Sequence, residues 1–183
     1  MAYTFDEHRL GLLQIAQVDT GVTTAQSTSD TSITTTIPTP PNVLGMVVRA
    51  KDPTFGEGEF ILLKGVASTI VGSAVTWDGT TYATTLCATT GNQARPIAWS
   101  MAANTSSSNF SWYQIGGTAV AAKSAVAINA KVAIGINSTG KIGNTATGKE
   151  IEGARSANAA TVASATTTIN IVIDRPALQG RIT

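Results

Sequence analysis

Residues 44–86 read LGMVVRAKDPTFGEGEFILLKGVASTIVGSAVTWDGTTYATTL, and this stretch determines the fold class that we expect. β-Branched and aromatic residues gather there in short runs, and Gly, Asp or Pro separates one run from the next at intervals of about ten residues. This spacing is typical of antiparallel β-sandwiches and barrels. The sequence therefore predicts an all-β protein, an antiparallel β-sandwich or barrel of the jelly-roll type.

The same pattern continues toward the C-terminus of the chain. The strands that we expect lie at 44–50, 59–64, 73–77, 80–86, 96–102, 110–116, 118–122, 129–136 and 166–174. Only residues 8–18 and 148–165 compete for helix, and glycines weaken both candidates.

One hairpin is specified in detail by the pair Asp78-Gly79, which stands between two alternating runs. Asp-Gly favours a two-residue turn of type I′. Such a turn would place Trp77 opposite Thr80 and Val75 opposite Tyr82.

The first 42 residues differ from the rest of the chain. Residues 22–41, VTTAQSTSDTSITTTIPTPP, are nearly all Thr, Ser, Ala and Pro, and the prolines exclude a helix there. We interpret 1–42 as an extended N-terminal arm and 43–183 as the β domain. Plain disorder is the alternative. We favour an arm that orders on a neighbouring protein, because it contains apolar residues that would otherwise lie on a solvated tail: Leu12, Leu13, Ile15, Ile33 and Ile37.

Composition and charge exclude several classes of function. The chain has 183 residues, 13% of them charged, with 12 Lys and Arg against 11 Asp and Glu, so no basic footprint for nucleic acid or for a membrane surface is present. The N-terminus lacks the apolar core of a signal peptide, and no apolar run is long enough to span a bilayer. Cys87 stands alone, which excludes an intrachain disulfide and suits synthesis in a reducing cytoplasm.

The inventory of catalytic and metal-binding residues is thin. The single histidine, His8, lies in the arm, and Cys87 has no basic neighbour in sequence to activate a thiolate. Glu57 and Glu59 would share one face of a strand, yet two acids so close in sequence cannot readily straddle a sugar. Asp52 could join them around a hard cation, without the ligand spacing of a calcium loop. We therefore expect no enzyme activity, no metal and no cofactor.

The large aromatic residues allow two interpretations. Trp77, Trp99, Phe110, Trp112 and Tyr113 are numerous for a small domain. Core packing is one interpretation, and a contact with a subunit or a ligand is the other, because Trp and Tyr often anchor interfaces.

Three stretches carry a resemblance to a known family: 49–77 (RAKDPTFGEGEFILLKGVASTIVGSAVTW), 96–117 (PIAWSMAANTSSSNFSWYQIGG) and 169–180 (INIVIDRPALQG). Their distinctive motifs are Asp52-Pro53, Gly56–Phe60, Lys64–Val66, Trp112–Ile115 and Arg175-Pro176. From about Leu44 to Pro176 the chain resembles virion proteins of tailed bacteriophages, described as capsid decoration, cement or head-stabilising proteins. The Thr-rich arm has no counterpart in this resemblance.

The resemblance implies a structural protein on the virion, made in the host cytoplasm and placed on the outer capsid surface. Its partner would be the major capsid protein, which it would stabilise against internal DNA pressure, and it would form a homo-oligomer, a trimer or a dimer. The contact residues that we expect are Leu12, Ile33, Ile37, Arg49, Lys51, Trp112, Tyr113 and Arg175. The alternative function is a head-fibre or tail protein that binds host-surface glycan through Trp99, Trp112 and Tyr113.

Overall fold

The structure of the chain, a computed structural model, describes residues 3–5, 13, 15–19, 22–24, 37–40 and 42–180. These residues form strands and connections without a helix, so the expected all-β class is confirmed. The strands are β1 (Thr4–Phe5), β2 (Val18–Asp19), β3 (Val22–Thr24), β4 (Ile37–Thr39), β5 (Val47–Asp52), β6 (Gly56–Lys64), β7 (Ala74–Trp77), β8 (Thr84–Leu86), β9 (Ile97–Ser100), β10 (Phe110–Ala122), β11 (Ala133–Ser138), β12 (Lys141–Asn144), β13 (Glu150–Ser156) and β14 (Thr168–Leu178).

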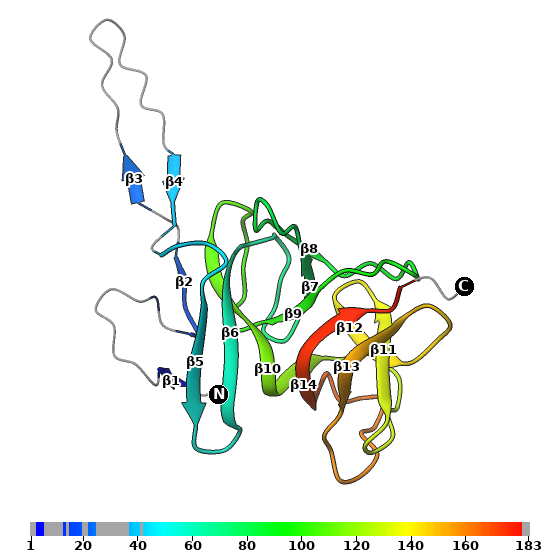
Figure 1. The fold of residues 1–183 in the computed structure, drawn as a ribbon. Coiled ribbons are helices and arrows are strands. Elements are labelled where there is room, and N and C mark those ends of the chain that lie inside the picture. The colour runs from blue at the N-terminus through cyan, green and yellow to red at the C-terminus, as the bar shows by residue number, and fades with distance from the viewer. Residues whose placement is uncertain are drawn as a thin grey trace, which may run out of the picture.

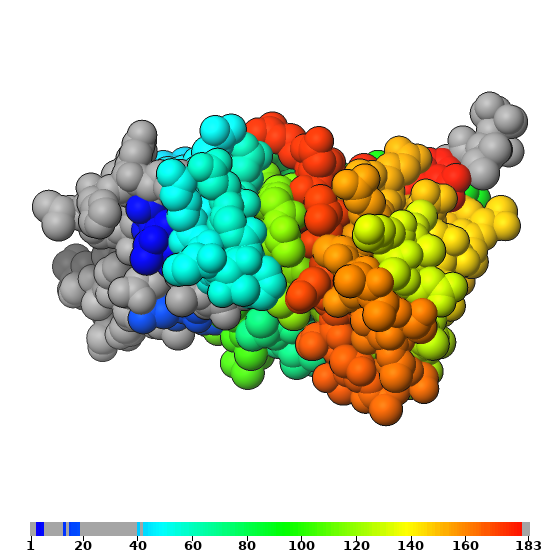
Figure 2. All heavy atoms as spheres, turned by 90° about the horizontal axis from the view of Figure 1, so that it is seen from below, coloured from blue at the N-terminus to red at the C-terminus, as the bar shows by residue number. Residues whose placement is uncertain are grey.

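Twelve strands belong to one antiparallel sheet, whose main path runs β1-β5-β6-β10-β14-β13-β11-β12. The two ends of this path do not pair, so the sheet stays open and is consistent with a sandwich rather than a barrel. Figure 1 shows β5 and β6 in one half of the molecule and β11 to β13 in the other, with β10 and β14 between them, and Figure 2 shows the same order from below.

The ribbon formed by β6 and β10 is buried on both faces. Alternate side chains point to opposite faces of a strand. Phe60, Leu62 and Trp112 pack in one cluster with the N-terminal Leu13 and Ile15. The residues that follow them in sequence, Ile61, Leu63 and Tyr113 among them, pack in a second cluster beneath β7 and β9. A third cluster, rich in isoleucine, fills the half built from β11 to β14.

The N-terminal segment is partly built into this body. β1 pairs with β5, and β2 pairs with β10. The Trp112 Nε1 donates a hydrogen bond of 2.6 Å to the main-chain oxygen of Leu13. These residues of the expected arm therefore pair with strands of the body, whereas β3 and β4 form a separate two-stranded sheet that projects from it (Figure 1).

The predicted turn at Asp78-Gly79 is wrong in register. β7 and β8 do pair, but Trp77 lies opposite Thr84, and residues 78–83 form the connection. The Asp78 Oδ1 accepts hydrogen bonds from the main-chain N–H groups of Thr80 and Thr81, at 3.0 and 2.7 Å. The carboxylate thus closes a wider turn, and the left-handed residue is Tyr82, with φ of 54°, instead of the Asp-Gly pair.

Other differences concern strand limits. The two strands expected at 110–116 and 118–122 are one strand, β10, which continues through Gly116 and Gly117. The segment considered for helix at 148–165 contains β13, and β12 was not expected. The helix candidate at 8–18 lies largely outside the described residues.

Candidate functional site

Charged side chains gather on one surface of β5, β6 and β14, which we call the charged face: Arg49, Lys51, Glu57, Glu59 and Arg175. Alternation along β5 produces this surface, because Arg49 and Lys51 are exposed, whereas Ala50 between them and Asp52 after them are buried. In the β5–β6 register Arg49 lies opposite Glu59, and Lys51 lies opposite Glu57. Opposite charges therefore face each other across the strands, which favours this register.

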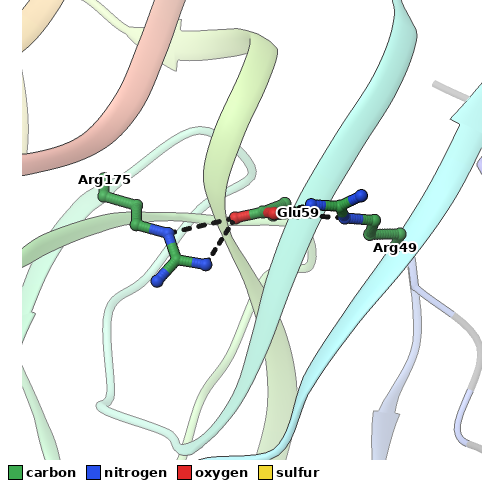
Figure 3. A network of polar contacts seen from close by, with 3 residues as sticks. All are labelled: Arg49, Glu59 and Arg175. Carbon is green, nitrogen blue, oxygen red and sulfur yellow. Dashed lines mark hydrogen bonds and ion pairs between the residues drawn. The ribbon is translucent and has the colours of Figure 1, made fainter.

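Glu59 is the centre of the charged face (Figure 3). Its Oε1 accepts hydrogen bonds from Nε and Nη2 of Arg49, at 3.2 and 3.0 Å. Its Oε2 accepts hydrogen bonds from Nε and Nη2 of Arg175, at 3.3 and 3.1 Å. The Glu59 side chain is 20% exposed, whereas those of Arg49 and Arg175 are 67% and 68% exposed. One carboxylate thus joins strands from both halves of the sheet, and the outer edges of both guanidinium groups remain open to solvent.

The Glu59 side chain extends from β6 across β10 to Arg175 on β14, and this depends on a glycine in β10. Gly116 of β10 lies opposite Glu59 on one side and Asp174 on the other. A Cβ at Gly116 would lie 3.2 Å from the Cβ of Glu59, closer than ordinary contact. Because glycine leaves this space empty, the Glu59 side chain can cross β10 toward Arg175.

Two irregularities in the sheet lie beside this crossing. The β6–β10 register shifts between Gln114 and Gly116, and the β13–β14 register shifts between Glu152 and Ala154. Arg175 lies in the second irregularity with φ of 38°, a left-handed value that is uncommon for a residue other than glycine. Bulges re-aim side chains, and here Arg175 is directed toward Glu59.

The pKa of Glu59 reflects the balance between burial of its carboxyl group and the two neighbouring arginines. Partial burial of the carboxyl group raises its pKa, whereas the hydrogen bonds and positive charges of Arg49 and Arg175 lower it, and the net result lies below the usual value. The carboxylate is therefore ionised at neutral pH, and the trio carries two positive charges and one negative charge. The trio therefore has a net positive charge, which favours contact with an acidic partner.

The depression on the charged face is small. The depression lined by Arg49, Glu57, Gly58, Glu59 and Gly117 has a volume of about 170 Å³. Ligand pockets usually measure about 300–1,000 Å³. The geometry therefore suits contact with another surface.

The sequence predictions for polar contact residues converge here. Arg49, Lys51 and Arg175 lie on the charged face, and Lys51 pairs with Glu57 at 3.5 Å. Sequence reasoning treated Glu59 only as a catalytic or metal-binding candidate and missed it as the group that joins two arginines. The alternation GEGEF was the available signal, since it puts Glu57 and Glu59 on the face that Arg49 and Lys51 share.

The apolar and aromatic residues that were predicted as contacts have a different outcome. Trp112 and Tyr113 are fully buried within the chain, as is Trp99, so the core interpretation is correct and these rings form neither a contact surface nor an exposed sugar-stacking platform. Leu12 and Ile33 lie outside the described residues. Ile37 begins β4, of which the structure describes the main chain.

The carboxylates considered for a cation do not converge. Asp52 is buried on the opposite face from Glu57 and Glu59, and its Oδ1 accepts main-chain hydrogen bonds from Thr54 and Phe55. Within the described ranges, no group of three or more His, Cys, Asp or Glu side chains could hold a metal ion. Cys87 is buried, and burial raises the pKa of its thiol.

Two further findings bear on the class of protein. Among the described residues, no helix is of the length and apolarity that a bilayer crossing requires. Comparison with protein-family models, with curated protein sequences and with solved structures gives no significant match.

Proposed function

We propose that this protein is a structural component of a bacteriophage virion, a decoration or cement protein that binds the outer surface of the capsid shell and stabilises it. The observation that carries this proposal is the sheet of β3 and β4, which pairs with no other strand that the structure describes. Each strand has three residues. Isolated two-stranded hairpins are at best marginally stable in water, so this one needs a surface to lie on.

The hairpin has the properties of a docking element. Its outer main-chain N–H and C=O groups can add to the edge of a neighbouring sheet, which gives affinity through main-chain hydrogen bonds. The residues of β3 are Val22, Thr23 and Thr24, whose β-branched side chains favour the extended conformation. A shell that offers a strand edge would complete a sheet that the chain leaves at two strands.

The charged face supports the same proposal as a second contact. The exposed guanidinium edges of Arg49 and Arg175 can each bind an acidic side chain while Glu59 holds the two groups in place. A contact of this kind contributes more to orientation than to affinity. The proposal includes the expected homo-oligomer and no catalytic role, since Glu57 and Glu59 are each paired with basic side chains.

The test uses expanded phage capsids stripped of this protein, with the purified full chain added back. Binding is read by sedimentation, and stabilisation by the temperature at which shells rupture. Stoichiometric binding in hundreds of copies, with a higher rupture temperature, is the expected result. Absence of binding, beside a dozen or fewer copies in native virions, would contradict a cement role and favour a fibre or tail protein.

A matched variant tests the role of the hairpin. Val22 and Thr39 are partners in the β3–β4 register, so an Asn-Gly turn can join them after removal of residues 23–38. We expect this trimmed chain to fold and to lose at least most of its capsid binding. A trimmed chain that occupies capsids as fully as the full chain would remove the hairpin from the proposal.

A further inference from the structure

A second polar region lies away from the charged face, on β7, β8 and the connection from β8 to β9. It is a groove of about 480 Å³. Its lining residues are Thr76, Thr85, Leu86, Ala88, Thr90, Gln93 and Arg95. None of these residues belongs to the hairpin or to the charged face.

The connection that forms one wall is held in a defined shape by main-chain hydrogen bonds. The N–H of Asn92 donates to Gly148, the N–H of Ala94 donates to Gln179, and the oxygen of Arg95 accepts from Leu178. Asn92 and Ala94 have φ values of 58° and 46°. Left-handed conformations cost free energy at residues other than glycine and persist only where the surroundings impose them. The wall is therefore preorganised, with Gln93 between two such residues.

Arg95 supplies the charge of the groove. Its side chain has no hydrogen-bond or ion-pair partner among the described residues. The pKa of the nearby Asp78 is lowered by hydrogen bonds that its Oδ1 accepts from the N–H groups of Thr81 and Thr80 and, to a lesser extent, by the positive charge of Arg95, and no hydrogen bond joins Asp78 to Arg95 among the described residues. An unpartnered guanidinium in a groove is a binding group for a carboxylate, which can accept both arms of its fork.

The other residues that line the groove indicate which kind of ligand it could bind. The hydroxyl groups of Thr76 and Thr85 form a hydrogen bond of 2.9 Å with each other, and Leu86 and Ala88 offer apolar contact. No aromatic ring lines the groove for stacking against a sugar. An acidic side chain of a protein fits this pattern, since its methylene groups can contact Leu86 while its carboxylate reaches Arg95.

We propose that this groove binds an acidic side chain, Glu or Asp, presented by a partner protein, with Arg95 as the residue that pairs with the carboxylate. The site is separate from the hairpin and from the charged face. It would give a bound copy a further contact whose specificity comes from charge.

The test is titration of the full, isotopically labelled chain with a blocked peptide, acetyl-Gly-Glu-Gly-Glu-Gly-amide, followed by amide chemical shifts in NMR spectra. We expect saturable shifts at Thr85, Gln93 and Arg95, and much smaller shifts with the matching Gln peptide. Arg95→Gln should weaken peptide binding by about fivefold, as expected for one exposed ion pair. Arg155→Gln is the matched control, because Arg155 is also an exposed arginine and lies on β13, and it should leave the affinity unchanged.

Several results would overturn the inference: no shifts at the groove, equal shifts with the Gln peptide, or equal affinity in Arg95→Gln. Tighter binding of a glucuronate oligosaccharide than of the Glu peptide would also overturn it, in favour of an acidic sugar. Capsid binding distinguishes this inference from the proposed function. If the full chain binds capsids but Arg95→Gln binds the Glu peptide as tightly as the wild type does, only the groove is refuted. If the peptide binds at the groove as expected but the full chain does not bind capsids, only the proposed function is refuted.

Discussion

The chain contains two antiparallel ribbons whose surroundings differ completely. β6 and β10 have 9 and 13 residues and are packed on both faces, with Trp112 on one side and Tyr113 on the other. β3 and β4 have three residues each and, among the described strands, pair only with one another. The strands of both ribbons are joined by main-chain hydrogen bonds, so strand pairing does not distinguish one ribbon from the other. The difference lies in their neighbours: the first ribbon is packed on both faces and pairs with further strands of the large sheet, and we propose that the second docks on a partner.

The largest effect should follow from a change in the packed ribbon. Trp112→Ala removes a fully buried ring and the hydrogen bond to Leu13. We expect a loss of about 3–5 kcal/mol in the free energy of unfolding, measured by denaturant titration. A loss under about 1 kcal/mol would show that this ribbon is not the centre of the fold.

A backbone change in the same ribbon should rank second. Gly117 has φ of 91°, and a Cβ there would meet the main-chain oxygen of Glu57. We expect Gly117→Ala to cost about 2–4 kcal/mol of unfolding free energy, because strain and overlap add.

Gly79→Ala is the control for that substitution. Gly79 lies in the connection after β7, where an added methyl group would have nothing within 4 Å and where φ is not left-handed. It should change the free energy of unfolding by less than about 0.5 kcal/mol. Equal effects of the two substitutions would contradict the geometry assigned to the β6–β10 ribbon.

The charged face should contribute less. Glu59→Gln leaves Arg49 and Arg175 without their shared carboxylate and should cost about 1 kcal/mol. Glu57→Gln breaks only the exposed pair with Lys51 and should cost less than about 0.5 kcal/mol. Denaturant titrations of both variants at neutral pH give the comparison, and a larger effect of Glu57→Gln would refute the central position of Glu59.

The contribution of Glu59 should also depend on pH in a defined direction. Its folded pKa lies below its unfolded value. Its stabilisation is therefore fully present above the unfolded pKa, near about 4.3, and is lost as the pH falls through the folded pKa. The difference in unfolding free energy between the wild type and Glu59→Gln should shrink below about pH 4. A difference that grows on acidification would have the wrong sign.

Removal of the hairpin should also have only a small effect on stability. Replacing residues 23–38 with Asn-Gly should change the free energy of unfolding by less than about 1 kcal/mol, because β3 and β4 pair with no strand of the body. Denaturant titration of the trimmed and full chains measures this. A loss comparable with that of Trp112→Ala would make the hairpin part of the fold.

Sequence patterns predicted the elements whose residues alternate or cluster strongly. The strand around Phe60 to Leu63 follows from hydrophobicity, whereas the size of Trp112 was compatible with both a core position and a contact surface. The segment of β13 has the sequence EIEGARS, in which Gly and polar residues hide the strand, and pairing with β14 decides its conformation. The preference of Asp-Gly for a two-residue turn was also misleading at Asp78-Gly79. The Asp78 carboxylate instead accepts hydrogen bonds from N–H groups of a wider turn.

The charged face was only half predictable. Arg49, Lys51 and Arg175 are polar residues next to apolar runs, so exposure could be expected. Their convergence on Glu59 could not, because Arg175 is 116 positions away from Glu59 in sequence and reaches it through a register shift and across Gly116. Such contacts depend on tertiary pairing rather than on spacing.

Hydrogen exchange of the full chain, alone and bound to capsids, tests most directly whether the second ribbon exists for a partner. We predict that amides of β10 exchange only on global unfolding in both states. Amides of β3 and β4 should exchange rapidly in the free chain and become protected on capsids. Protection of β3 and β4 equal to that of β10 in the free chain, or no gain in protection on capsids, would contradict this assignment.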